Sequence, residues 1–182
     1  MNLKELFVTH CSPTFAGLKP SNLFTINAND INNNIGELRM IIRQIKSSGL
    51  SVRMICKCRD RVLVLVYRKE MLEKSIDIEK RNFLHTMDYP KSDDLEIYIN
   101  YLAKKLKRED SFPHEIGVFL GIPLEDIHGY IENRGQSFKH CGYWKVYGDC
   151  EGCKKLFSDF RNSFIENINK IRNGAEIEEL IS

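Results

Sequence analysis

The sequence has almost no excess of charge and no long apolar run. Its 182 residues include 27 Lys and Arg against 25 Asp and Glu, a formal net charge of +2. So small a charge does not favour nucleic acid or an anionic membrane as a partner. No segment approaches the roughly 18 apolar residues of a membrane-spanning helix, and no export signal opens the sequence. We therefore expect a cytoplasmic protein and do not expect nucleic acid or a membrane as its partner.

Apolar residues are plentiful enough to build a core. They make up 42% of the chain and include ten Phe, seven Tyr and one Trp. A chain of this length and composition folds without disulfide or metal support. The sequence therefore predicts a single domain over residues 1–182, with residues 173–182 as a frayed tail.

The spacing of apolar residues predicts an α+β fold with a small, mainly antiparallel sheet packed against several helices. Side chains of different polarity alternate before Asp60, and a mostly β-branched apolar run follows it. This pattern predicts a hairpin over residues 51–67 with a central second strand. Residues 143–147 are predicted to form a further strand of the same sheet. Residues 1–28 predict a strand or short helix, then an ordered loop and a short extended piece. The spacing of apolar residues and the helix start and stop signals predict helices over residues 30–49, 69–87 with a break, 92–107, 114–120, 123–133 and 151–172.

Three segments resemble a known family. They are HCSPT with GLKP and LF at residues 10–24, FPHEIG with FLGIPLED at residues 112–126, and GYWKVYGD at residues 142–149. Together they resemble the family named domain of unknown function 3793, which comprises short proteins of anaerobic Gram-positive bacteria. The resemblance runs from Val8 to the closing helix. The cysteine pair Cys150 and Cys153 departs from it, because the family pattern has no cysteine pair there. It implies no activity, so the residues are interpreted by their chemistry.

The segment from Cys11 to Pro20 is the first candidate site, because it concentrates a thiol, hydroxyls and a lysine in ten residues. A cation at Lys19 would favour the thiolate of Cys11, which is the nucleophilic form. The alternative is a small buried thiol in a rigid turn.

His114 and Glu115 form a second candidate, at a helix start after Pro113. A histidine there can act as acid, base or ligand, and with Cys11 it would complete a nucleophile and base pair. The alternative is that Glu115 stabilises the helix N-terminus and His114 bonds locally. The same region, with residues 115–131, fits a helical corner, but its acidic residues argue against binding DNA.

The cysteines offer redox or metal chemistry. Cys150 and Cys153 have the spacing of a dithiol at a helix start, where the thiol pKa falls. The candidate zinc ligands are Cys56, Cys58, Cys141, Cys150 and Cys153. The alternative is that all of these thiols are unliganded.

Aromatic residues of the strand 143–147 can stack on a flat ligand, with Lys145 near a phosphate. Strand alternation predicts Tyr143, Lys145 and Tyr147 on one face and Trp144 on the other.

These candidates predict a cytoplasmic protein that binds a small molecule or a metal. The pocket would be formed by the Cys11 loop, with Lys19, the His114 helix start and the Trp144 strand, and Cys11 would act as nucleophile or ligand. One alternative is a non-catalytic interaction or regulatory module whose helical corner binds a protein partner. A second is a dithiol redox protein using Cys150 and Cys153. No cofactor and no reaction follow from the sequence.

Overall fold

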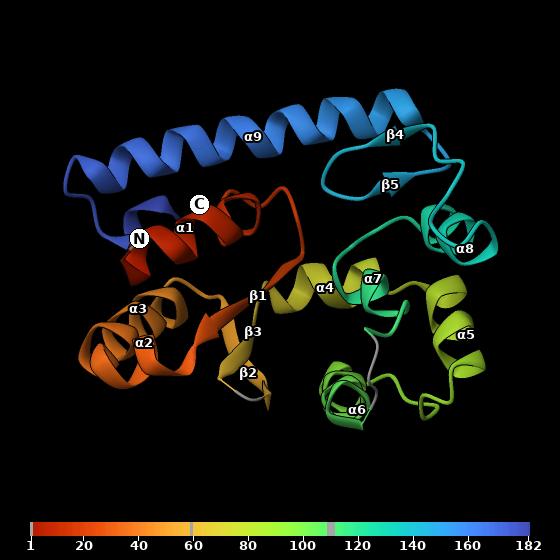
Figure 1. The fold of residues 1–182 in the computed structure, drawn as a ribbon, viewed down its shortest axis with the longest axis horizontal. Helices are drawn as coiled ribbons and strands as arrows, with labels where there is room; N and C mark the ends of the chain where they lie inside the picture. The colour runs from red at the N-terminus through yellow and green to blue at the C-terminus, as the bar shows by residue number, and fades with distance from the viewer. Residues whose placement is uncertain (1, 59, 109–111) are drawn as a thin grey trace. The chain divides into compact units, whose positions relative to one another are not determined.

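The computed structural model describes residues 2–58, 60–108 and 112–182, without the side chains of Cys58 and Arg108. The chain is an α+β protein that divides into two compact units (Figure 1). Unit 1 comprises Met1–Glu70 and Asp159–Ser182, and unit 2 comprises Met71–Ser158.

Unit 1 is built on a three-stranded antiparallel sheet with the strand order β1-β3-β2. The strands are β1 (Ser21–Asn27), β2 (Ser51–Cys58) and β3 (Arg61–Tyr67). Every residue of β3 after Arg61 is buried, as expected for a β-branched and aliphatic run in a central strand. The predicted hairpin and its central second strand are therefore confirmed.

The prediction that residues 143–147 belong to this sheet is wrong. The third strand is β1, which pairs with β3 along its whole length, from Ser21 opposite Tyr67 to Asn27 opposite Arg61. In the predicted strand only β5 (Lys145–Val146) is extended, and it pairs with β4 (His140–Cys141) in unit 2. Local strand preference does not specify a pairing partner, so the sequence could not distinguish the two sheets.

Helices cover one face of the sheet of unit 1. They are α1 (Leu3–Phe15), α2 (Ala28–Asn33), α3 (Ile35–Ser47) and the short 3-10 helix η1 (Ile177–Leu180), with the later part of α9 (Cys150–Arg172). The predicted helix over residues 30–49 is thus divided at Asn34. Phe7, Phe24, Ile41 and Val64 lie in one buried cluster, which is the core of this unit.

The segment after Cys11 is helical, which corrects the predicted loop over residues 11–20. Helix α1 continues through Pro13 to Phe15, and all of its residues from Cys11 onward are buried. Proline removes one helical hydrogen bond, and burial of the last turn outweighs that loss. The loop is therefore shorter than predicted and begins at Ala16.

The predicted fraying of residues 173–182 is also wrong. Ile177 is fully buried and Leu180 is 5% exposed, and both belong to the core of unit 1. Glu176 and Glu179 form a capping box at the start of η1. A terminal segment is ordered when apolar side chains anchor it, and these two residues are such anchors.

Unit 2 is mainly helical. Its helices are α4 (Lys69–Ser75, which begins in unit 1), α5 (Ile78–Thr86), α6 (Leu95–Arg108), α7 (Ile116–Phe119), α8 (Leu124–Glu132) and the first part of α9. Tyr98, Leu102 and Phe119 are among its most buried side chains. The predicted helical corner is confirmed as the pair α7 and α8. Gly117 permits its close packing, because an added Cβ would lie 2.9 Å from Ile127 Cγ1.

Candidate functional site

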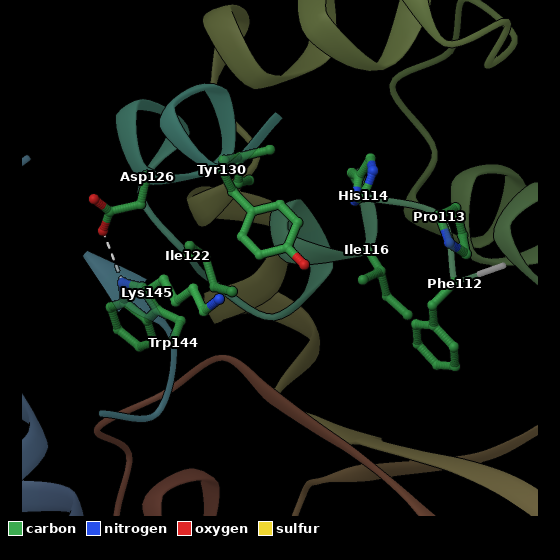
Figure 2. Close-up of a pocket in the computed structure, with 11 residues that line it drawn as sticks. Phe112, Pro113, His114, Ile116, Ile122, Asp126, Tyr130, Trp144 and Lys145 are labelled. Carbon is green, nitrogen blue, oxygen red and sulfur yellow. Dashed lines mark hydrogen bonds between the residues drawn. The ribbon is translucent and has the colours of Figure 1, made fainter. Parts of the chain in front are cut away.

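A pocket of about 350 Å³ lies in unit 2, between the corner of α7 and α8 and the β5 strand (Figure 2). Tyr130 stands in the middle of the view, with Trp144 and Lys145 on one side and His114 and Phe112 on the other. Most of the lining is apolar or aromatic. The lining residues are Phe112, Pro113, His114, Ile116, Gly117, Ile122, Asp126, Ile127, Tyr130, Trp144 and Lys145.

Asp126 organises one wall of this pocket. Its side chain lies in the first turn of α8, and the residue is 2% exposed. Its Oδ2 accepts a hydrogen bond from Trp144 Nε1 at 2.7 Å, and its Oδ1 accepts from the backbone N–H groups of Tyr147 at 2.7 Å and Gly148 at 2.9 Å. Charge-assisted bonds of this kind compensate the burial of a carboxylate. Asp126 therefore joins α8 to the segment that carries Trp144.

Trp144 is held in one orientation by contacts on two sides. Besides its bond to Asp126, its ring meets the Phe157 ring edge to face, with centroids 4.5 Å apart and an interplanar angle of 88°. Edge-to-face packing is a favoured arrangement of aromatic rings. Since the chain has one Trp, any tryptophan signal of the protein reports on this pocket.

Lys145 supplies positive charge at the pocket. Its Nζ donates to the carbonyl oxygen of Gly135 at 2.7 Å. It also lies 5.8 Å from the ring centroid of Tyr130 and 5.0 Å from that of Phe138, within range of cation–π attraction. These contacts hold the ammonium group beside the Tyr130 ring.

His114 lines the pocket, whereas Glu115 does not. The exposed His114 ring lies 5.4 Å from the Tyr130 ring, centroid to centroid. Glu115 is 3% exposed, and its Oε1 lies 2.5 Å from Lys105 Nζ on α6. Its carboxylate makes no side-chain capping bond to α7. The side chain of Glu115 thus links two helices of unit 2, and its predicted catalytic role gains no support.

The predicted alternation of the aromatic strand is wrong. The neighbours Trp144 and Lys145 both line the pocket, while Tyr143 is 50% exposed and lies outside the lining, 5.5 Å from the Phe157 ring. Residues 142–144 form a bend, and only Lys145 and Val146 are extended. Successive side chains point to opposite faces only along a continuous strand. Because this segment is bent, the order of its residues does not determine which side chains share a face.

Cys11 and Lys19 lie in unit 1. Cys11 is fully buried in α1, and this burial raises the pKa of its thiol far above the usual value, although the charge of Lys19 acts in the opposite direction. Burial also lowers the pKa of Lys19 to about 8. A buried, protonated thiol is a poor nucleophile. The catalytic role of Cys11, and a pocket that it shares with His114 of unit 2, stay predictions.

Cys150 and Cys153 lie at the start of α9, where Asp149 Oδ1 accepts a hydrogen bond from Gly152 N at 2.9 Å. Cys153 is 6% exposed, and its Sγ lies 3.9 Å from Asp126 Oδ2. Burial, followed by the charges of Asp126 and Asp149, raises the pKa of Cys153 to about 11. The predicted lowering of the thiol pKa is therefore wrong for Cys153, because carboxylates and burial outweigh the helix N-terminus.

The candidate zinc ligands do not assemble among the described side chains. No group of three or more His, Cys, Asp or Glu within that part of the chain is arranged to hold a metal ion. Cys56 is buried on β2 in unit 1, whereas Cys141, Cys150 and Cys153 belong to unit 2. The side chain of Cys58 lies outside the described residues.

Sequence reasoning missed three lining residues that shape the site, namely Asp126, Tyr130 and Ile122. One signal was present for Asp126. A half-buried tryptophan needs an acceptor for its indole N–H, and an Asp at a helix start is a suitable one. Tyr130 follows Asp126 by four residues, which places both on one face of α8.

Fold and pocket together define an α+β protein with an aromatic-lined cavity in its mainly helical unit. The chain belongs to the family described as Protein of unknown function (DUF3793), whose model matches residues 7–181. The resemblance found in the sequence is thereby confirmed. No curated protein and no solved structure matches the chain. Across the described residues, no helix is both long and apolar enough to cross a membrane, and the cytoplasmic location stays a prediction.

Proposed function

We propose that unit 2 binds a small organic molecule in the pocket around Tyr130 and Trp144. The observation that carries the proposal is the pocket itself, a cavity of about 350 Å³ lined by apolar and aromatic side chains and a few polar ones. Binding sites for small molecules combine these features, with volumes from about 300 to 1,000 Å³. The cavity lies at the lower end of that range, so the ligand is small.

The rigidity of the wall supports this proposal. Trp144 is fixed by Asp126 and Phe157, and Lys145 by Gly135, within the protein alone. A wall ordered in advance loses little side-chain entropy when a ligand arrives, which favours binding. The proposal requires no residue of unit 1, so it does not depend on Cys11 or Lys19.

A fragment screen followed by nuclear magnetic resonance tests the proposal. We expect a subset of aromatic fragments to shift the indole N–H signal of Trp144 in ¹H–¹⁵N spectra of the whole protein. The variant Ile122→Phe places a larger side chain in the lining and weakens those shifts. Its matched control is Ile78→Phe, because Ile78 is 70% exposed on α5 and lies outside the lining. A screen without shifts, or shifts unaffected by Ile122→Phe, would contradict the proposal.

A second candidate function is thiol–disulfide exchange at Cys150 and Cys153. The observation that favours it is the placement of both cysteines in the first turn of α9, the spacing at which a dithiol can close to a disulfide. In the reaction both thiols would be oxidised to a disulfide while a small-molecule disulfide is reduced to two thiols. Alkylation and mass spectrometry in glutathione buffers near about −200 mV test it, since a pair that stays reduced there is not a redox centre.

A further inference from the structure

We infer that the ligand of this pocket is a flat aromatic molecule with a negatively charged group, and that Lys145 binds this group. The inference rests on the proposed function and adds the chemical class of the ligand. It follows from three properties of the lining: the donors that it offers, the state of its one carboxylate, and the placement of its rings.

Three polar side chains of the lining can donate hydrogen bonds to a ligand: Lys145, Tyr130 and His114. Lys145 carries three N–H bonds, and one of them is directed to the oxygen of Gly135. Tyr130 adds a hydroxyl group, and the exposed His114 adds an imidazole that becomes a cation on protonation. Figure 2 shows the Lys145 side chain extending from the Trp144 side toward Tyr130. A ligand that satisfies these donors presents acceptors, and an anion does so best.

The carboxylate of Asp126 in the lining is not available to bind a cationic ligand. Asp126 is 2% exposed, and each of its oxygens already accepts two hydrogen bonds, Oδ1 from backbone N–H groups and Oδ2 from Trp144 Nε1 and Cys153 Sγ. A carboxylate in this state has little capacity left for a cationic ligand. The charge that the lining presents to a ligand is therefore positive.

Two aromatic rings favour a flat ligand body. Trp144 and Tyr130 belong to different elements, and each is held by neighbours, Trp144 by Phe157 and Tyr130 by contacts with His114 and Lys145. Fixed rings bind a planar molecule by stacking or by edge contacts. Because the pocket is small, a ligand of one or two fused rings suits it.

A matched series of naphthalenes tests the inference on the whole protein. The probes are 2-naphthoate and 2-naphthyl phosphate as anions, 2-naphthamide as the neutral analogue and 2-naphthylmethylamine as the cation. The Trp144 indole N–H signal provides the dissociation constants. We expect at least one anion to bind about tenfold more tightly than the amide, which is the effect of one charge-assisted hydrogen bond, and the cation to bind weakest. The tighter anion distinguishes a carboxylate from a phosphate ligand.

Lysine variants assign the anion contact. Lys145→Gln removes the charge, so the anions should bind no more tightly than the amide, and Lys145→Arg should restore the preference. The control is Lys139→Gln, because Lys139 also donates to a backbone oxygen, that of Gly148 at 3.0 Å, and lies outside the lining. Lys139→Gln should prefer the anions over the amide as strongly as the wild type does.

The outcomes separate this inference from the proposed function. Equal or tighter binding of the amide or the amine overturns the inference, while the Trp144 shifts still support the pocket. A preference that survives in Lys145→Gln overturns the role of Lys145. If none of the four probes shifts Trp144, the inference fails, and the fragment screen decides the binding function separately. Should Lys145→Gln not fold, the wild-type series still shows whether the pocket prefers anions, and Lys145→Arg shows whether a different cation at this position keeps that preference.

Discussion

Replacing Asp126 with Asn should destabilise unit 2 strongly, although the two side chains have nearly the same shape. The carboxylate accepts three hydrogen bonds from N–H groups, those of Trp144 Nε1 and of the Tyr147 and Gly148 backbone. It also accepts a longer one from Cys153 Sγ. An Asn amide has one oxygen. If that oxygen keeps both backbone bonds, the new N–H₂ group faces the indole N–H of Trp144, donor against donor.

The structure sets the size of this effect. At least one charge-assisted hydrogen bond is lost, worth about 1.5–3 kcal/mol, and a buried donor is left without an acceptor. We therefore expect the free energy of unfolding to fall by about 2–4 kcal/mol. Because Trp144 loses its anchor, the affinity of aromatic probes for the pocket should fall as well.

Urea denaturation, followed by circular dichroism, measures the effect. The matched control is Asp149→Asn, since Asp149 is exposed and accepts one hydrogen bond, from Gly152 N at the start of α9. Asn serves as well as Asp in such a capping position, so this variant should lie within about 0.5 kcal/mol of the wild type. If Asp126→Asn is as stable as Asp149→Asn, the carboxylate does not organise the pocket wall.

Two further predictions concern packing and pH. Gly129→Ala should lower the free energy of unfolding by about 1–3 kcal/mol, since the added Cβ would overlap the side chain of Tyr147. Gly36→Ala should not, because nothing beyond its chain neighbours and the α3 backbone lies within 4 Å of the added Cβ. Equal thermal melting of the two variants would refute this. Burial lowers the pKa of Lys19 to about 8. Between about pH 8 and 10.4, therefore, the lysine binds more protons in the unfolded chain than in the folded protein. Its contribution makes the free energy of unfolding rise with pH in this range. The wild type should thus gain unfolding free energy relative to Lys19→Met from pH 8 to 10 in urea titrations, and a constant difference would contradict the burial of the charged lysine.

Local signals in the sequence predicted the elements that depend on local interactions. Helical spacing located α6, α8 and α9, and the glycine at position 121, which has a φ of +71°, ends the α7 turn where it was expected. The run after Asp60 predicted β3 as a central strand. These features follow from periodicity and backbone preference, which a single sequence carries.

Features that depend on tertiary packing were predicted poorly. Pro13 indicated a break, yet the last turn of α1 is buried, and the segment after Arg172 indicated fraying, yet Ile177 is anchored in the core. For the site, His114, Trp144 and Lys145 were identified by their chemistry. Asp126 was not, because its role depends on residues 18 to 22 positions away in the sequence.

The most direct test of the binding site is a crystal structure of the protein soaked with 2-naphthoate. Our account predicts the naphthalene ring against Trp144 and Tyr130, with the carboxylate within hydrogen-bond distance of Lys145 Nζ. A ring bound elsewhere while this cavity stays empty, or a carboxylate turned away from Lys145, would contradict it.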